Sequence, residues 1–250
     1  MVGIGARIGW RLVLTAAAGV LALVPPAIGL PNHAAAPRAV HSPNWSGYVV
    51  LSPHRFAAVV GTWKEPTVRC PDSTGHASVA IWDGLDGYRS RTVEQIGSKT
   101  TCVDGTPRYR VWWQMWPKPV HFLAATTYPV VPGDRLTATV RRTGSRYRLR
   151  LTNSAGWSFA TTRKGTAKAA SAEWIVSSPR SCQTCGYDPL ARFTPVSFSR
   201  TRASTGQGSQ AITAYPHTRA VTMRRAGTVR SRPGVIADRR HTFRIRWTHG

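Results

Sequence analysis

The stretch WDGLDGYRSRTVEQIGSKTTCVDGTPRYRVWWQMWP, from Trp82 to Pro117, organises the rest of the chain. It contains four of the ten tryptophans, and Asp86, Gln95 and Gln114 stand among them. Rigid aromatic side chains around a few polar groups are typical of a binding groove. Any single tryptophan could equally belong to the core, so the prediction of a groove depends on the cluster as a whole.

Short alternating runs of apolar and polar residues follow this stretch. The segments Arg135–Val140 (RLTATV) and Tyr147–Leu151 (YRLRL) alternate, and residues that favour turns follow each of them. Such runs are typical of half-buried antiparallel strands. Beyond the amino-terminal region, no segment keeps a helical period for about 12 residues. The pattern predicts an all-β protein, a β-sandwich of about a dozen strands.

The amino terminus has the pattern of a signal peptide. Arg7 and Arg11 precede the apolar run Leu12–Val24, which two prolines end. A run of this length suits a signal peptide and is short for a membrane span. We therefore expect residues 1–29 to be a signal peptide, residues 30–43 a flexible tail and residues 44–250 a single domain. The mature protein would then be secreted.

Export affects the interpretation of the four cysteines, Cys70, Cys102, Cys182 and Cys185. An even number of cysteines in an oxidising compartment favours disulfides, and four cysteines allow 3 connectivities. We favour Cys70–Cys102 and Cys182–Cys185, because each pair is close in sequence. A zinc site is not indicated, since the chain has one Cys-x-x-Cys motif and no histidine pair at ligand spacing. We expect no metal and no cofactor.

The chain is strongly basic, with 34 Lys and Arg residues against 10 Asp and Glu residues and a formal net charge of +24. The basic residues are spread along the chain, whereas nucleic-acid binders more often concentrate them in a stripe. We therefore expect no specific nucleic-acid binding. Adhesion to an anionic polymer or membrane surface is the more natural consequence of this charge. We also expect a monomer.

Familiar catalytic motifs are missing from the sequence. It contains no G-x-S-x-G elbow, no H-E-x-x-H motif and no glycine-rich phosphate loop. Only three glutamates occur, Glu65, Glu94 and Glu173, which restricts any carboxylate mechanism to very few residues.

Seven short motifs, in this order along the chain, resemble those of the glutamic peptidases, or eqolisins. They are Asn44–Gly47 (NWSG), Gly61–Pro66 (GTWKEP), Trp82–Gly87 (WDGLDG), Val93–Gly97 (VEQIG), Tyr109–Pro117 (YRVWWQMWP), Pro132–Asp134 (PGD) and Ser171–Val176 (SAEWIV). The resemblance implies a sandwich of two curved antiparallel sheets, of the concanavalin A-like or jelly-roll type, with a substrate groove on a concave face. It also implies an endopeptidase in which a glutamate and a glutamine activate a water molecule. The glutamate would take the proton and the glutamine would stabilise the oxyanion.

The resemblance assigns roles to particular residues. Gln95 matches the catalytic glutamine of the family. Trp82, Asp86 and Trp112 match positions that shape the substrate groove. Gln114 stands where fungal members often carry an acid, so we expect it to contact the substrate without that charge.

One position departs from the family pattern. The catalytic glutamate of the family corresponds to Ser177, which follows the run AEWIV. Glu173 lies four residues earlier, about 13 Å away along a strand, and is therefore a poor substitute acid. Asp86 is the other nearby acid, but it would need a different geometry. A serine hydroxyl is itself a poor base.

Three functions remain open from the sequence. The first is a secreted glutamic-type endopeptidase that is impaired by the serine at position 177. The second is a non-catalytic relative whose groove binds peptide or another polymer such as polysaccharide, and the third is a carbohydrate-binding sandwich that uses its tryptophans. Simple structural roles are also available, since Gln95 could hydrogen-bond within a strand, Asp86 could cap a turn and Glu173 could pair with an arginine.

Overall fold

The computed structural model describes residues 36–71, 75–182, 184–237 and 240–249, together with residues 1–3, 5 and 9. Most of the predicted signal peptide and the first part of the predicted tail therefore lie outside the described residues. Among the residues that are described, no helix is long and apolar enough to cross a membrane.

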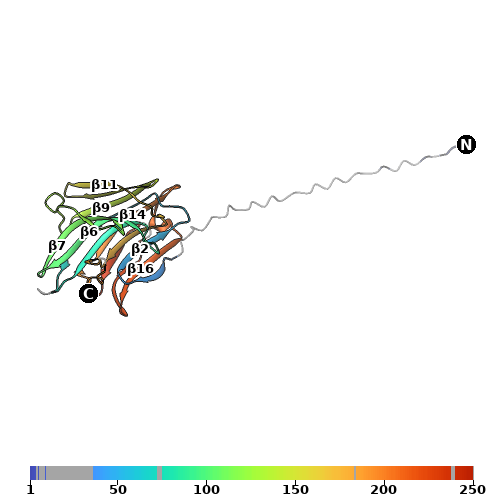
Figure 1. Ribbon diagram of the computed structural model, residues 1–250. Coiled ribbons are helices and arrows are strands. Elements are labelled where there is room, and N and C mark those ends of the chain that lie inside the picture. Colours follow the sequence, from blue (N-terminus) through green and yellow to red (C-terminus); the bar gives the residue numbers. More distant parts are fainter. Residues whose placement is uncertain are drawn as a thin grey trace. The chain divides into compact units, whose positions relative to one another are not determined.

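The described chain is built almost entirely from strands, with one short 3-10 turn, η1 (Ile212–Ala214). The strands are β1 (Arg38–Ser42), β2 (Trp45–Leu51), β3 (Ala58–Lys64), β4 (Val68–Arg69), β5 (Ser78–Leu85), β6 (Val93–Val103), β7 (Thr106–Trp116), β8 (His121–Phe122), β9 (Arg135–Thr143), β10 (Arg146–Asn153), β11 (Ser158–Lys164), β12 (Ser171–Ser177), β13 (Arg192–Phe193), β14 (Val196–Thr205), β15 (Gly208–Ala211), β16 (His217–Arg225), β17 (Thr228–Pro233) and β18 (Phe243–Trp247). Figure 1 shows them as long, curved ribbons.

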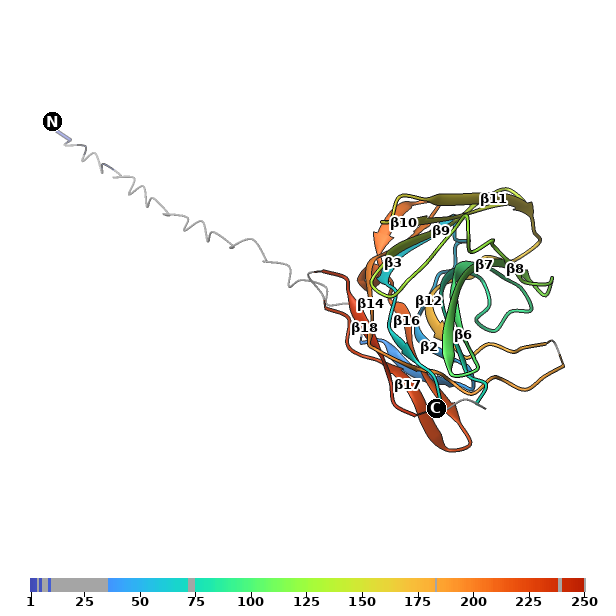
Figure 2. The same ribbon diagram turned by 90° about the vertical axis from the view of Figure 1, so that its left-hand side faces the viewer.

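Strands β4 and β13 pair with each other in a small separate sheet. The other strands form one continuous sheet that bends back over itself into two layers. Its order is β11-β10-β9-β3-β14-β18-β17-β16-β2-β12-β5-β6-β7-β8. The outer layer runs from β11 to β14, the inner layer runs from β16 to β8, and β17 and β18 turn the corner between them (Figure 2). The layers contact each other through β3, β9 and β10 on one side and β5, β6 and β12 on the other. The predicted all-β sandwich is therefore confirmed, although its two layers are joined at one edge.

Alternation along the strands builds the core between the layers. In β10, Tyr147, Leu149 and Leu151 are buried, while Arg146 and Arg148 point to solvent. This alternation follows from the period of two in a strand, and it places every second residue against the opposite layer. The largest buried side chains of this core include Trp63 and Trp174.

A second apolar cluster covers the other face of the inner layer. In the central strand β12, Trp174 and Val176 point into the core between the layers, and Ile175 lies in this second cluster. In β5, Ala80 and Trp82 belong to the same second cluster. Ser177 lies two residues after Ile175, so its side chain points to the same face of the inner layer as this second cluster.

The ordered fold begins earlier than expected. Residues 30–43 were predicted to be a flexible tail, but Arg38–Ser42 form β1 and pair in parallel with β16. The backbone of this segment adds to the edge of β16, and its apolar Val40 packs against the second cluster. Composition alone did not reveal this pairing, because a proline- and alanine-rich segment looks like a linker.

Two disulfides are present, and they join the pairs expected from the sequence. Cys70 and Cys102 are linked with a Cα–Cα distance of 5.5 Å, and Cys182 and Cys185 with one of 5.1 Å. The first bond ties the loop after β4 to the end of β6. The second closes a short loop between β12 and β13.

Candidate functional site

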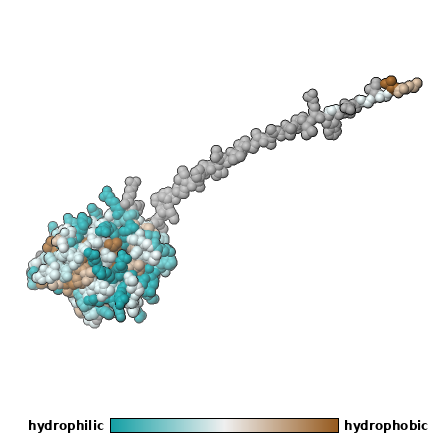
Figure 3. All heavy atoms as spheres, turned by 90° about the horizontal axis from the view of Figure 1, so that it is seen from above, coloured by the Kyte–Doolittle hydropathy of each residue, from teal (hydrophilic) through white to brown (hydrophobic). Residues whose placement is uncertain are grey.

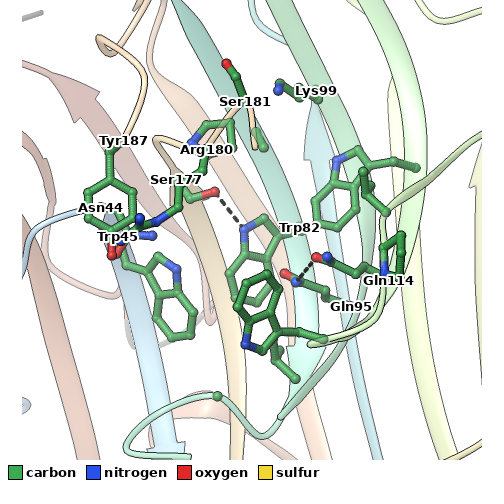
Figure 4. Close-up of a pocket in the computed structure, with 18 of the residues that line it drawn as sticks. Asn44, Trp45, Trp82, Gln95, Lys99, Gln114, Ser177, Arg180, Ser181 and Tyr187 are labelled. Atoms are coloured by element: carbon green, nitrogen blue, oxygen red, sulfur yellow. Dashed lines mark hydrogen bonds between the residues drawn. The ribbon is translucent and has the colours of Figure 1, made fainter. Parts of the chain in front are cut away.

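A groove with a volume of about 550 Å³ opens on the face of the inner layer that carries the second apolar cluster. Strands β5, β6, β7 and β12 supply its floor, and the loop between β12 and β13 supplies one rim. Aromatic side chains form much of its wall: Trp45, Trp82, Trp112, Trp116, Phe122 and Tyr187. Trp45 meets Trp82 edge to face, with ring centroids 5.0 Å apart. The predicted tryptophan-lined groove thus corresponds to a real cavity (Figure 4).

Three predicted groove residues come from β6 and β7, where they face the cavity through strand alternation. Gln95 lies on β6 directly opposite Gln114 of β7, and Trp112 is two residues before Gln114. Trp113 alternates to the opposite face and packs into the core between the layers. The tryptophan cluster in the sequence therefore contains both groove residues and a core residue.

A chain of amides fixes the orientation of Gln95. Gln114 Nε2 donates to the carbonyl oxygen of Lys118 at 2.9 Å, and Gln95 Nε2 donates to Gln114 Oε1 at 2.9 Å. A carbonyl can only accept, so Gln114 must direct its amino group to Lys118 and its oxygen to Gln95. Among the described residues, the oxygen and the second N–H of the Gln95 amide have no side-chain hydrogen bond beyond this chain, so a ligand in the groove could use them. Its side chain is nearly buried, at 8% exposure, so it is held at the groove floor.

Ser177 stands on the opposite side of Trp82. Trp82 Nε1 donates to Ser177 Oγ at 3.0 Å. Ser177 pairs with Ala80 of β5, whereas Gln95 pairs with Gly84, so Trp82 lies midway between them along β5 (Figure 4). Both Gln95 and Ser177 line the groove.

Gly97 makes room for Trp82 at this point. It pairs with Trp82 across β5 and β6. A Cβ atom at position 97 would lie 1.9 Å from the carbonyl oxygen of Ile81 and 2.7 Å from Trp82 Cβ. Any side chain here would push β5 away from β6 and displace the indole ring.

The described residues that line the groove include no aspartate, no glutamate and no histidine. Its charged groups are the cations Lys99 and Arg180. Lys99 Nζ lies 3.9 Å from Asp188 Oδ2, and burial lowers the pKa of the lysine while Asp188 opposes that shift. The groove wall therefore offers amides, hydroxyls, indoles and positive charge, but no group that could act as a general base at acid pH.

Glu173 is close in register but is not part of the groove surface. It lies on the same face of β12 as Ser177. It pairs with Gly84 of β5, which in turn pairs with Gln95 of β6. Its side chain is fully buried, and burial raises the pKa of its carboxyl well above the usual value. It makes no ion pair with any described residue, so pairing with arginine does not explain it. Because Glu173 does not line the groove, its carboxyl is not placed to take a proton from a groove water.

Asp86 is also fully buried, and it organises a loop beside the groove. Its Oδ2 accepts hydrogen bonds from the hydroxyls of Ser90 and Thr92 and from the backbone N–H of Lys168, each at 3.0 Å. Asp86 itself adopts a positive φ of 67° at the turn. The structure therefore does not bring Asp86 to the groove wall. It positions Ser90 and Thr92, which do line the wall.

A serine and a histidine meet near one end of the groove without forming a catalytic triad. His76 Nε2 lies 3.1 Å from Ser181 Oγ and 3.4 Å from Asp188 Oδ2. In a triad the acid holds Nδ1 while Nε2 faces the serine, but here one nitrogen faces both partners. Ser181 Oγ also donates to Asp188 Oδ1 at 2.6 Å, so its proton is already engaged.

Several groove residues were missed by the sequence analysis. Trp45 and Trp116 occur in quoted motifs, and their aromatic character was a usable signal. Lys99 lies four residues after Gln95, and the period of two would have placed both on one face of a strand. Arg180 and Tyr187 come from an irregular loop, where no periodicity indicates the direction of a side chain.

The sequence profile described as the Peptidase A4 family matches residues 43–236. No curated protein matches the sequence at a significant level.

Three solved structures share the fold. Scytalido-glutamic peptidase with a peptide-based transition-state analogue is 18% identical, with a TM-score of 0.71, covering 83% of this chain and 99% of that chain. SCP-B, a member of the eqolisin family in complex with the tripeptide Ala-Ile-His, is 17% identical with a TM-score of 0.67, covering 83% and 99%. Aspergilloglutamic peptidase from Aspergillus niger is 22% identical with a TM-score of 0.58, covering 69% and 99%.

Proposed function

Because the chain belongs to the peptidase A4 family, we propose that it is an exported member that binds an extended polypeptide in its groove. We further propose that hydrolysis by a Gln/Glu-activated water is impaired, because Ser177 replaces the general base. The protein would then act on polypeptides slowly, or capture them without cleavage.

The observation that carries this proposal is the lack of any carboxylate among the described residues that line the groove. Water attacks an amide carbonyl efficiently only when a base removes its proton, and such a base contributes about 10²–10⁴-fold to the rate. The hydroxyl of Ser177 already accepts a hydrogen bond from Trp82, and a serine is a poor base without a partner that removes its own proton. The glutamate on the same strand, Glu173, is fully buried, and burial raises the pKa of its carboxyl.

Gln95 supports a retained capacity for polypeptide binding. Its amide keeps one N–H donor and one oxygen acceptor directed into a tryptophan-lined channel. Such a pair of groups matches the carbonyl and N–H of a peptide bond, and the indole rings supply apolar walls for side chains. Two relatives of the same fold were solved with a peptide-based analogue and with a tripeptide. We extend peptide binding to this chain on that basis.

Secretion is part of the same proposal. The amino-terminal apolar run suits export, and two disulfides join all four cysteines. Disulfides form and persist in oxidising compartments, so they agree with an extracellular location.

Tryptophan fluorescence offers a direct test of binding. Four tryptophans line the groove, so titration with a mixture of unstructured peptides at pH 4 should change the emission in a saturable manner. Mass spectrometry of the same samples should find the peptides intact over hours. Matched titrations with Gln95→Ala should weaken the binding. If neutral polysaccharides change the emission and peptides do not, the proposal of a polypeptide ligand is wrong.

A further inference from the structure

The outer layer carries positive charge on its solvent face. We define the outer basic face by six residues of β3, β9, β10 and β11: Lys64, Arg135, Arg141, Arg146, Arg148 and Lys164. All six are exposed, and the strand neighbours of five of them point into the core, namely Trp63, Leu136, Val140 and Tyr147. Figure 3 looks onto this side of the sandwich and shows hydrophilic side chains across its middle.

Register brings these cations directly opposite one another. Arg146 pairs with Lys164, Arg148 pairs with Arg141, and Lys64 pairs with Arg135. Like charges placed directly opposite on neighbouring strands are destabilising. Three such pairs on one surface therefore oppose folding unless an anion lies between them.

Among the described residues, none of these six cations forms an ion pair with an acid. All three glutamates are buried, including Glu65, which lies beside Lys64 and Arg135. Asp134, the neighbour of Arg135, is half-buried, and its carboxylate accepts hydrogen bonds from the backbone N–H of Val131 and from Asn153 Nδ2. The basic residues of the outer face are thus left with solvent or an external ligand as their counter-charge.

A shallow basin extends the same surface. Lys64 and Arg135 line it together with Arg240, Arg244 and Arg246, and its volume is about 940 Å³. Alternate residues on a strand are about 6.6 Å apart and neighbouring strands about 4.8 Å apart. The cations therefore form an extended array rather than a pocket for a single ion, and an array matches a polymer with repeated charges.

Apolar and aromatic groups are scarce on this face. The exposed aromatic side chains of the described residues, Trp116 and Phe122, belong to the groove. Binding of single-stranded nucleic acid relies on aromatic rings that stack on the bases. Stable attachment to a membrane generally needs a second, apolar signal beside the charge, and the basin offers only the single exposed Val235.

We propose that the outer basic face binds a linear acidic polysaccharide that carries sulfate or phosphate groups. The planar guanidinium group of arginine matches the oxygens of such groups in a bidentate manner. Sulfate and phosphate diesters stay charged in acid, where carboxylate polymers lose their charge. The face lies on the opposite side of the sandwich from the groove, so a polymer bound there would leave the groove open.

Lysine footprinting on the wild-type protein tests the proposal. The chain has only five lysines, and Lys64 and Lys164 lie on the outer basic face, whereas the exposed Lys118 lies beside the groove. Dextran sulfate and dextran phosphate should each slow acetylation of Lys64 and Lys164 at least about 5-fold, and that of Lys118 less than about 2-fold. Comparing the protection given by the two polymers shows whether the face prefers sulfate or phosphate groups. Equal protection of all three lysines would overturn the proposal.

A matched pair of variants gives a second test. The first is Arg141→Gln/Arg146→Gln/Arg148→Gln, and the control is Arg89→Gln/Arg91→Gln/Arg108→Gln, which removes the same charge from exposed sites elsewhere. The first should weaken binding of dextran sulfate about 10-fold or more and lower the slope of log K against log salt by about 2. The control should change both quantities by less than half as much. Equal effects of the two variants, or tighter binding of wild-type protein to an oligonucleotide or to phosphatidylglycerol vesicles, would refute a polysaccharide site here.

Discussion

The two sides of the groove differ in their polar groups and in how firmly hydrogen bonds hold them. On the β6–β7 side, Gln95 is held by Gln114, which is in turn held by the backbone of Lys118. On the β12 side, Ser177 only accepts a hydrogen bond from Trp82. The first side therefore presents an oriented amide to the groove, and the second side presents a hydroxyl and, among its described lining residues, no carboxylate.

This difference teaches that the shape of the groove does not depend on a catalytic charge. Trp82 packs closely on Gly97 and donates its indole N–H to the hydroxyl of Ser177, so this N–H has a partner without a carboxylate. The acids that the chain does keep are mostly buried. They hold loops and strands in place, as Asp86 does with Ser90 and Thr92.

Restoring an acid on the β12 side should remove most of the difference. We expect Ser177→Glu to raise kcat/KM for peptide hydrolysis at pH 3–5 by about 10²–10⁴-fold, since a base then faces the groove water. The measurement is cleavage of a quenched fluorescent peptide. Ser177→Gln is the matched control, because it has nearly the same volume and cannot accept the proton. A folded Ser177→Glu variant without activity would contradict the assignment of position 177.

Removing the amide from the β6 side should then cancel that gain. In the Ser177→Glu background, Gln95→Ala should lower kcat by about 10²–10³-fold, because an oxyanion donor is lost. In the wild-type background the same change should leave the hydrolysis rate unaltered. The double-mutant cycle measures the coupling of the two positions, and additive effects would show that they do not share one reacting centre.

The buried acids predict a protein that is more stable in acid. Burial raises the pKa of Glu65 to about 7, although Ser98 and Trp63 donate hydrogen bonds to it, and burial together with Asp86 raises the pKa of Glu94 to about 8. The folded state therefore binds more protons than the unfolded state between about pH 4.5 and pH 8. The stabilisation is complete below pH 4.5 and is lost as the pH rises through 7 and 8.

Thermal or urea unfolding at pH 4 and pH 8 checks this expectation. Between about pH 4.5 and pH 7 both glutamates lower the free energy of unfolding as the pH rises, and the share of Glu65 should be about 1.4 kcal/mol per pH unit. Glu65→Gln should flatten the profile, because the amide oxygen can still accept from Trp63 and Ser98. An unchanged profile in that variant would mean that Glu65 titrates normally.

The smallest expected effect is on stability and concerns Trp82, whose indole ring lies between the two sides of the groove. Trp82→Phe removes the indole N–H and leaves Ser177 Oγ without its donor. The loss of one hydrogen bond should lower the free energy of unfolding by about 1 kcal/mol, with a further cost for the smaller ring. Trp112→Phe is the matched control, since the Nε1 of Trp112 has no hydrogen-bond partner among the residues that the structure describes. Equal losses in the two variants would show that the hydrogen bond contributes little.

Much of the fold could be predicted from local pattern. Alternation in β10 and the order of short motifs both indicated a sandwich, because a period of two directly encodes which side chains reach a core. The start of the fold could not be predicted in this way. β1 is held by backbone pairing with β16, nearly 180 residues away along the chain, and backbone hydrogen bonds leave little trace in composition.

The site was predicted less completely than the fold. Gln95, Trp82 and Trp112 line the groove, and the motif order that indicated them also gives the family. Asp86 and Glu173 are buried instead. This could not be predicted, because a sequence motif does not specify the side-chain packing that decides whether an acid faces a groove. The contribution of the β12–β13 loop to the groove could not be predicted, since an irregular loop has no periodicity that indicates where its side chains point.

The central claim is that the groove retains its amide but lacks a base. Casein digestion by the purified mature protein between pH 2 and pH 5, compared with Gln95→Ala, tests it most directly. We predict little or no cleavage, and no difference between the two proteins. Rapid cleavage that Gln95→Ala abolishes would contradict the claim, because it would require a base that acts in concert with Gln95.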